Sequence, residues 1–194
     1  MRKAVDLGRL GRFLEALGKA LEHPATIYLV GGASAVLSGW RQTTRDVDLY
    51  AEDDALLRLI PRLKEELSTS VETASPLDFV PELPGWRDRS PYVRTEAQLT
   101  VRNFDFYSQA LSKIERGFDT DRADVRAMVE IGLVDPARLL ELFEAVADQL
   151  YRFPAINADE LRSGVTRLVW GRATITGEPM PDVVRAVRRS RRSP

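Results

Sequence analysis

The chain has 194 residues, of which 44% are hydrophobic and 29% are charged, and its formal net charge is −1. This composition is ordinary for a soluble globular protein, and the length suits one well-packed domain or two small lobes. No apolar run is long enough to span a bilayer, and the N-terminus lacks the continuous apolar core of a secretory signal. We therefore expect a cytoplasmic protein with no membrane partner.

Cysteine and histidine usage narrows the chemistry further. The sequence has no cysteine and a single histidine, His23, so disulfides, thiolate zinc sites, a cysteine nucleophile and a multi-histidine metal site are excluded. His23 stands before a proline where a helix is expected to end, a position that favours interaction with the helix dipole over a Ser-His-Asp site. Catalysis must then rest mainly on carboxylates, lysine, arginine and bound metal.

Hydrophobic periodicity predicts a mixed first half and a helical second half. The elements expected in the first half are a helix over residues 4–22, a strand over 25–30, a short helix after Gly31-Gly32, a strand over 46–51, a helix from Asp53 or Asp54 to about Leu67 with Pro61 inside it, a short strand within 76–86, and a strand–turn–strand pair over 92–104. After about residue 104, apolar stripes predict four helices, the last with Asn157 as its N-cap. The predicted fold class is α+β, with a small mixed β-sheet lobe over residues 1–103 and a helical lobe over 104–194.

Two carboxylates on the second strand are the first chemical signal. Asp46 and Asp48 are separated by one residue, so they project to the same side of a strand while Val47 and Leu49 face the core. Two carboxylates on one face repel each other unless a cation lies between them, and Mg²⁺ is the usual cation where phosphates are also handled. The alternative is a pair of exposed acids on an edge strand.

The Gly31-Gly32 turn is the second signal. A strand that ends in two glycines and opens into a helix presents backbone N–H groups at the positive end of the helix dipole, where a phosphate can approach closely. Ser34, in the first turn, adds a hydroxyl. A glycine pair alone is a common turn, but beside a carboxylate pair it forms the combination that nucleotidyl transfer requires.

A two-metal site of this kind usually needs a third carboxylate. Asp78, between Leu77 and Phe79 on the expected short strand, is the candidate. Its alternative is a solvent-facing residue of an amphipathic strand. Asp105 is the competitor, although its position suits the N-cap of the following helix.

The stretch GGASAVLSGWRQTTRDVDL resembles the signature of the polymerase-β-like nucleotidyltransferase superfamily: an apolar residue, a G-[G/S] step, a spacer, then D-x-D. More narrowly it looks like the branch of AbiEii/MenT-type toxin nucleotidyltransferases, which approach the strand with R-x-T-x-D-[IV]-D, matched here by Arg41, Thr43, Asp46, Val47 and Asp48. Gly32 stands where many members have serine. The helical half is similar to the branch at Lys113-Ile114 and at Asp121 and Asp124, so the resemblance covers about residues 26–145.

This resemblance implies the roles of individual residues. Asp46 and Asp48 would bind Mg²⁺, with Mn²⁺ as a substitute, and Asp78 would complete the metal site. The nucleoside triphosphate would contact a set of residues on the glycine turn, on its approach to the strand and on the helical half, namely Gly31, Gly32, Ser34, Arg41, Thr43 and Lys113. Asp124, and less surely Asp121, would orient Lys113 or the substrate. For Lys113 the alternative is a surface lysine, and for the two aspartates it is helix capping and surface ion pairs.

The expected activity is Mg²⁺-dependent transfer of a nucleoside monophosphate from a nucleoside triphosphate to an acceptor hydroxyl. The acceptor could be an RNA 3′ end, a protein or a small molecule, and the resemblance favours the toxin of a toxin–antitoxin pair with tRNA as acceptor and an antitoxin protein as partner. The tail 182–194 carries five arginines and one aspartate, which is compatible with RNA or with a solvated terminus. Two alternatives remain: a degenerate nucleotide-binding or interaction module, and a D-x-D glycosyltransferase.

Overall fold

The computed structural model describes residues 4–176 and divides them into two compact units. The first unit contains the residues up to Asp78 together with Gly85–Gln109, and the second contains Phe79–Pro84 together with the residues from Ala110 onward. The arginine-rich tail 182–194 is compatible with contact to RNA by its charge, and it lies outside the described residues. None of the helices in the described part combines the length and the apolar surface that a membrane crossing requires.

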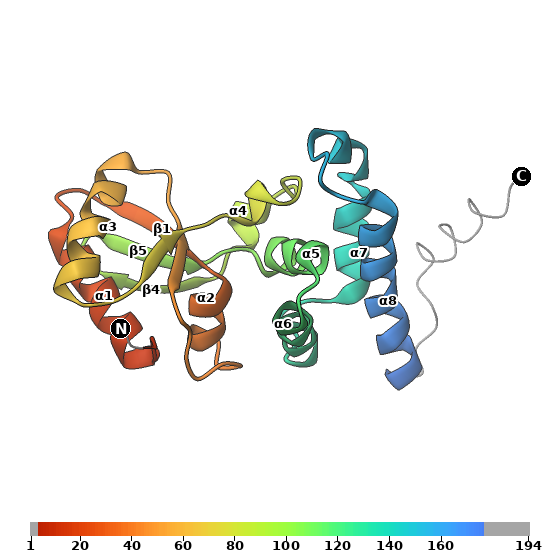
Figure 1. The fold of residues 1–194 in the computed structure, drawn as a ribbon, viewed down its shortest axis with the longest axis horizontal. Helices are drawn as coiled ribbons and strands as arrows, with labels where there is room; N and C mark the ends of the chain where they lie inside the picture. Colours follow the sequence, from red (N-terminus) through yellow and green to blue (C-terminus); the bar gives the residue numbers. More distant parts are fainter. Residues whose placement is uncertain (1–3, 177–194) are drawn as a thin grey trace, which may run out of the picture. The chain divides into compact units, whose positions relative to one another are not determined.

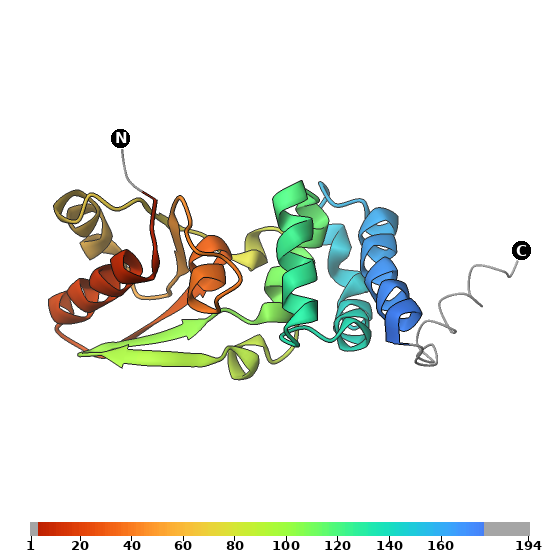
Figure 2. The same cartoon turned by 90° about the horizontal axis from the view of Figure 1, so that it is seen from below.

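The first unit is built on a five-stranded mixed sheet with strand order β3-β2-β1-β5-β4 (Figure 1). Its strands are β1 (Ala25–Val30), β2 (Val47–Tyr50), β3 (Val71–Thr73), β4 (Tyr92–Glu96) and β5 (Leu99–Asn103). The central strand β1 is antiparallel to β2 and parallel to β5, while β3 is parallel to β2. Strands β4 and β5 form an antiparallel hairpin, drawn in green in Figure 2.

One face of this sheet carries the hydrophobic core. Helices α1 (Leu7–Ala20) and α3 (Asp54–Glu66) contribute their apolar stripes to the same buried cluster as the inward residues of β1 and β2. The buried strand residues there are fully shielded from solvent: Ile27, Leu29, Val47 and Leu49. Burial of a side chain of this size is worth about 1.5–3 kcal/mol, so this face fixes which residues of β2 point inward.

The opposite face carries an aromatic group at the short helix α4 (Trp86–Arg89). Tyr28 of β1 pairs in register with Tyr50 of β2, and both alternate with the core-facing residues. The Trp86 ring stacks on Phe104 with centroids 4.2 Å apart and lies edge-on to Tyr28 at 5.1 Å. These rings cover the sheet on the side to which the even-numbered residues of β2 project.

The second unit consists of helices. They are α5 (Phe106–Arg116), whose first turn belongs to the first unit, α6 (Asp119–Glu130), α7 (Pro136–Glu144), the 3₁₀ turn η2 (Ala147–Arg152) and α8 (Ala158–Thr176). Met128, Phe143 and Val165 are among the side chains buried in its interior. Asn157 Oδ1 accepts hydrogen bonds from the N–H groups of Asp159 and Glu160, as expected for the N-cap of α8.

The α+β class and the predicted helices are confirmed, but one predicted strand is wrong. Residues Pro76–Asp78 form a 3₁₀ turn, η1, instead of a strand. Ser75 Oγ accepts a hydrogen bond from the N–H of Leu77, which closes this turn, and the prolines at 76, 81 and 84 supply no N–H to a sheet. The strand beside β2 is instead the preceding segment Val71–Thr73.

The division into units also differs from the predicted boundary between residues 103 and 104. The first unit extends to Gln109, one turn into α5, and the segment Phe79–Pro84 groups with the helical unit. Val80 and Leu83 are fully buried, which anchors that segment. The sequence pattern cannot show that these residues belong to the helical unit, because a stretch of six residues is too short to have a periodicity.

Candidate active site

Asp48 lies in β2, on the face opposite the main core, and Asp46 lies in the bend just before this strand. Exposure alternates along this stretch: Val47 and Leu49 are buried, while Asp46 and Asp48 are half-buried. Asp48 is paired in register with Val30, the last residue of β1. Asp46 makes no hydrogen bond or ion pair with the described residues, so its carboxylate is available to a ligand.

Gly31 stands directly against Asp48. Its φ is +55°, and a Cβ added to it would lie 2.8 Å from Asp48 Oδ2. A residue with a side chain would be strained in this left-handed backbone conformation, and its Cβ would also displace the carboxylate. The glycine therefore sets the position of Asp48 at the point where β1 ends and helix α2 (Gly31–Leu37) begins.

Gln109 holds this turn in place. Its Oε1 accepts a hydrogen bond from the N–H of Gly31 at 3.0 Å, and its Nε2 donates to Ser34 Oγ at 3.2 Å and to the carbonyl of Phe104 at 2.9 Å. The side chain is almost completely buried. The sequence alone did not single out Gln109, because a glutamine on a helix carries no motif that distinguishes a buried bridge from a surface residue.

Ser34 has a packing role in place of the predicted contact with a triphosphate. Its side chain is fully buried, and its hydroxyl donates to Asn103 Oδ1 at 3.0 Å while accepting from Gln109. A phosphate could reach this hydroxyl only after the turn had opened. The sequence pattern located Ser34 correctly in the first helical turn, but a seven-residue helix has too little periodicity to show which side of it is buried.

The segment between α2 and β2 positions the remaining predicted contacts. An added Cβ at Gly32 would collide with the side chain of Thr44. The backbone of Thr44 is held by an isolated antiparallel β-bridge, in which Val5 and Thr44 each donate an N–H to the carbonyl of the other. Gly32 therefore allows this segment to pass close to α2. Arg41 lines a shallow hollow together with residues at the start of α1, and Thr43 is exposed. Their predicted contacts with a nucleotide stay predictions.

A third carboxylate does not complete the metal site as predicted. Among the residues that the structure describes, no three acidic or histidine side chains lie close enough together to hold a metal ion. Asp78 is exposed at the end of the 3₁₀ turn. Glu72 of β3 is paired in register with Asp48, which places it on the same face of the sheet. Sequence reasoning missed this glutamate because the strand that carries it is only three residues long.

Asp105 is fully engaged as a helix cap. Its carboxylate is 1% exposed and accepts hydrogen bonds from the N–H and the hydroxyl of Ser108, at 3.2 and 2.8 Å. Arg89 adds a bidentate ion pair, with its Nε 3.1 Å from Oδ1 and its Nη2 2.8 Å from Oδ2. The expected N-cap role is confirmed, and these contacts leave little capacity for a metal ion.

The second unit contains a buried ionic cluster around Lys113. Lys113 is 4% exposed, and its Nζ lies 2.7 Å from Asp124 Oδ2 and 3.2 Å from Asp121 Oδ1. Arg116 Nη2 adds a contact to Asp121 Oδ1 at 2.6 Å, while the other oxygen of Asp121 is buried and has no hydrogen-bond partner among the described residues. The cluster joins three residues that the sequence singled out, and the predicted reach of Lys113 to a triphosphate stays a prediction.

The donor set at β2 suits Mg²⁺ bound together with a triphosphate. Mg²⁺ is commonly held by one or two carboxylates, with substrate phosphates and water completing its coordination. Asp46 and Asp48 supply two such carboxylates, and Asp48 lies beside a turn without side chains.

A family model described as "Nucleotidyltransferase of unknown function (DUF6036)" matches residues 6–163. Among solved structures, the chain is similar to an antigenic nucleotidyltransferase-like protein from Paracoccidioides brasiliensis, with 16% sequence identity and a TM-score of 0.44, over 84% of this chain and 94% of that one. No curated protein matches the sequence.

Proposed function

Because the chain belongs to the nucleotidyltransferase family DUF6036, we propose that it transfers a nucleoside monophosphate from a nucleoside triphosphate to an acceptor hydroxyl, with Mg²⁺ held by Asp46 and Asp48. One observation carries the proposal: Asp48 of β2 is seated against Gly31, where the turn has no side chain, and Asp46, in the bend just before β2, is half-buried like Asp48 while Val47 between them is buried. Mn²⁺ is a natural substitute, since it accepts the same oxygen ligands.

The chemistry is an in-line displacement at the α-phosphorus. The acceptor oxygen forms a bond to this phosphorus, the bond to the bridging oxygen of the β-phosphate breaks, pyrophosphate leaves, and the hydroxyl proton passes to water. The metal supplies neutralisation of phosphate charge. Asp46 and Asp48 would hold it, and the glycine turn would let the phosphates approach the start of β2.

Gln109 sets a condition on phosphate binding. The N–H of Gly31 already donates to Gln109 Oε1, so it becomes available to a phosphate only when this side chain turns away. The predicted roles of Gly31 and Gly32 in contacting a triphosphate therefore belong to a state in which phosphate replaces the amide oxygen. Such an exchange is balanced, because one acceptor replaces another on the same N–H.

The acceptor is inferred from the family resemblance and from the charge of residues 182–194. We infer an RNA 3′ end, with tRNA as the first candidate, from the resemblance to AbiEii/MenT-type toxins, which also suggests an antitoxin partner. The five arginines within residues 182–194 support an RNA acceptor by charge. A protein hydroxyl or a small molecule are the alternatives to test.

The test is incorporation of label from each of the four α-³²P nucleoside triphosphates into tRNA, protein and small acceptors, with Mg²⁺ or Mn²⁺. We expect Asp46→Asn and Asp48→Asn each to lower incorporation more than about 100-fold. Asp88→Asn is the matched control, because Asp88 is exposed on α4 and makes no hydrogen bond or ion pair with the described residues. Equal incorporation by wild type and Asp48→Asn would refute the metal assignment.

Two further arms separate the alternatives. Glu72→Gln tests whether the glutamate beside Asp48 takes part, and a loss as large as that of Asp48→Asn would add it to the metal ligands. Label transfer from a sugar nucleotide, with none from a triphosphate, would instead indicate a glycosyltransferase. Absence of Mg²⁺-dependent triphosphate binding in calorimetry would indicate a degenerate module.

A further inference from the structure

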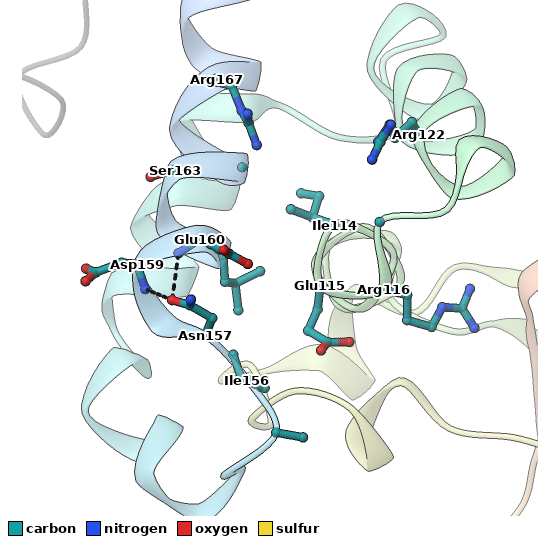
Figure 3. Close-up of a pocket in the computed structure, with 14 residues that line it drawn as sticks. Ile114, Glu115, Arg116, Arg122, Ile156, Asn157, Asp159, Glu160, Ser163 and Arg167 are labelled. Atoms are coloured by element: carbon teal, nitrogen blue, oxygen red, sulfur yellow. Dashed lines mark hydrogen bonds between the residues drawn. The ribbon is translucent and has the colours of Figure 1, made fainter.

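The second unit contains a groove that the proposed reaction does not use. A hollow of about 1070 Å³ lies between α5, the start of α6 and the first half of α8, and a second hollow of about 940 Å³ continues it along α6 and α8. The two share Ile114, Gly117, Arg122, Gly164 and Arg167. Figure 3 shows Arg122 and Arg167 extending into the first hollow from opposite sides, with Ile114 between them.

The second hollow is rich in unneutralised positive charge. Arg126 and Arg167 make no hydrogen bond or ion pair with any residue of the described chain. Among the described residues Arg122 pairs only with Asp119, and both of these side chains are largely exposed, at 68% and 98%, so the pair is weak. Glu130 is the one acidic residue that lines this hollow within the described chain. Three guanidinium groups around one space repel each other, and an anionic ligand would relieve that repulsion.

The same hollow has an aliphatic lining. Val125 and Val129 are one helical turn apart on α6, and Ile114 of α5 and Leu168 of α8 also line this hollow. Gly164 lets α8 approach α5 closely at this hollow, because a Cβ at Gly164 would lie 2.6 Å from Ile114 Cγ2. No aromatic residue lines either hollow within the described chain, so the groove lacks the stacking surfaces on which single-stranded nucleic acids are bound.

We propose that this groove, defined by Ile114, Arg122, Arg126, Val129, Arg167 and Leu168, binds an acidic amphipathic helix of a partner protein. The apolar face of such a helix would cover the aliphatic residues, and its carboxylates, one turn apart, would meet Arg122 and Arg126 on α6 and Arg167 on α8. The chain's own residues 177–194 are a poor match, since they carry five arginines against two acids. The proposal does not depend on the nucleotidyl transfer described above.

The test is selection of peptides on the full-length protein. A displayed library of random 16-residue peptides is selected against wild type and against the double variant Arg122→Glu/Arg167→Glu. We expect wild type to enrich peptides with Leu or Ile at helical spacing and with Glu or Asp on the flanks. A synthetic peptide of the enriched sequence should bind the double variant at least tenfold more weakly, measured by fluorescence anisotropy.

Two control variants keep the result specific to the groove. Arg138→Glu alters an exposed arginine on α7 that does not line the groove and should leave binding unchanged. Leu168→Glu removes the aliphatic wall without touching an arginine and should weaken binding as well. Circular dichroism confirms that each variant is folded.

Several outcomes would overturn the proposal. Enrichment of no peptide, or of neutral or basic peptides, would remove the charge complementarity on which it rests. Equal binding by the double variant would place the peptide elsewhere. Binding of a mixed-sequence single-stranded RNA that is lost in the double variant, with no peptide enriched, would make the groove a nucleic-acid site instead. Peptide binding that appears only after deletion of residues 177–194 would show that the chain's own tail occupies the groove.

Discussion

Gln109 Oε1 accepts a hydrogen bond from the backbone N–H of Gly31 at 3.0 Å, across 78 positions of sequence. This bond ties the first turn of α5 to the turn that carries the candidate phosphate contact. The amide nitrogen of Gln109 also donates hydrogen bonds to Ser34 Oγ and to the carbonyl of Phe104, which directly follows β5. The conformation of the turn thus depends on a residue far away in the chain.

Replacement of Gln109 by alanine should destabilise the protein by about 2–4 kcal/mol. The substitution removes three hydrogen bonds, two of them buried and one part-buried, and takes away the partner that Gln109 gives to the polar groups of Gly31 and Phe104. Urea denaturation measures the change. Gln98→Ala, at an exposed position in the β4–β5 turn, should change stability by less than about 0.5 kcal/mol. A similar small change for Gln109→Ala would show that this network is dispensable.

Gly31→Ala should abolish nucleotidyl transfer, while Gly39→Ala should preserve it. Both glycines have positive φ, +55° and +87°, so alanine is strained at either position by about 1–2 kcal/mol. Only at Gly31 does the added Cβ meet Asp48 Oδ2, whereas at Gly39 it meets nothing within 4 Å. The comparison therefore separates displacement of the carboxylate from backbone strain. Stability and incorporation are measured on both variants, and equal activity would show that Asp48 tolerates displacement.

Lys113→Met should destabilise the protein by about 3–5 kcal/mol, because Asp121 and Asp124 would be left buried without their lysine. The triple variant Lys113→Met/Asp121→Asn/Asp124→Asn should recover a large part of the loss, since it removes the buried charges together. Urea denaturation measures both changes. If the single variant instead keeps its stability but loses transfer activity, Lys113 acts on the substrate, as the family resemblance implies, and its ion pairs are secondary.

The sequence predicted the parts of the site whose signals are local. Alternation along DVDLY predicted that Val47 and Leu49 are buried, and they are, because period-2 burial is strong wherever one face of a sheet packs on a core. The metal-binding role of Asp46 and Asp48 stays a prediction. The nucleotidyltransferase family is confirmed by the match over residues 6–163, whereas the toxin branch remains a proposal. Side-chain chemistry likewise predicted the cap of α3 at Asp53 or Asp54, of which Asp53 is the cap, and the cap of α8 at Asn157.

The failures have a common physical cause, which is dependence on distant residues. Ser34 was expected to face a phosphate, but whether a first-turn hydroxyl is exposed depends on Asn103 and Gln109, which arrive much later in the chain. Asp78 was expected on a strand, but Ser75 and the neighbouring prolines turn the chain there. The neighbour of β2 is decided by strand pairing, and a three-residue strand such as β3 is too short to leave a pattern.

Asp53 should make stability depend on pH in the acid range. The backbone N–H of Leu56 and, next, the His23 side chain lower the pKa of this carboxyl below its ordinary value. A lowered acid pKa means that the folded state favours the charged form, so the stabilisation is complete above the unfolded pKa of about 3.9 and is lost as pH falls through the lower folded pKa. We expect Asp53→Asn, which keeps an oxygen to accept from Leu56, to reduce this dependence.

Melting temperatures of wild type and Asp53→Asn between pH 2 and pH 7 measure the effect. Other carboxylates titrate over the same range, so the difference between the two proteins is the informative quantity, and it should shrink below about pH 4 as Asp53 becomes protonated. Asp54→Asn, which removes the adjacent carboxylate but leaves the cap in place, serves as the control. A difference that stays constant from pH 7 to pH 2 would mean that ionisation of Asp53 adds nothing to the cap.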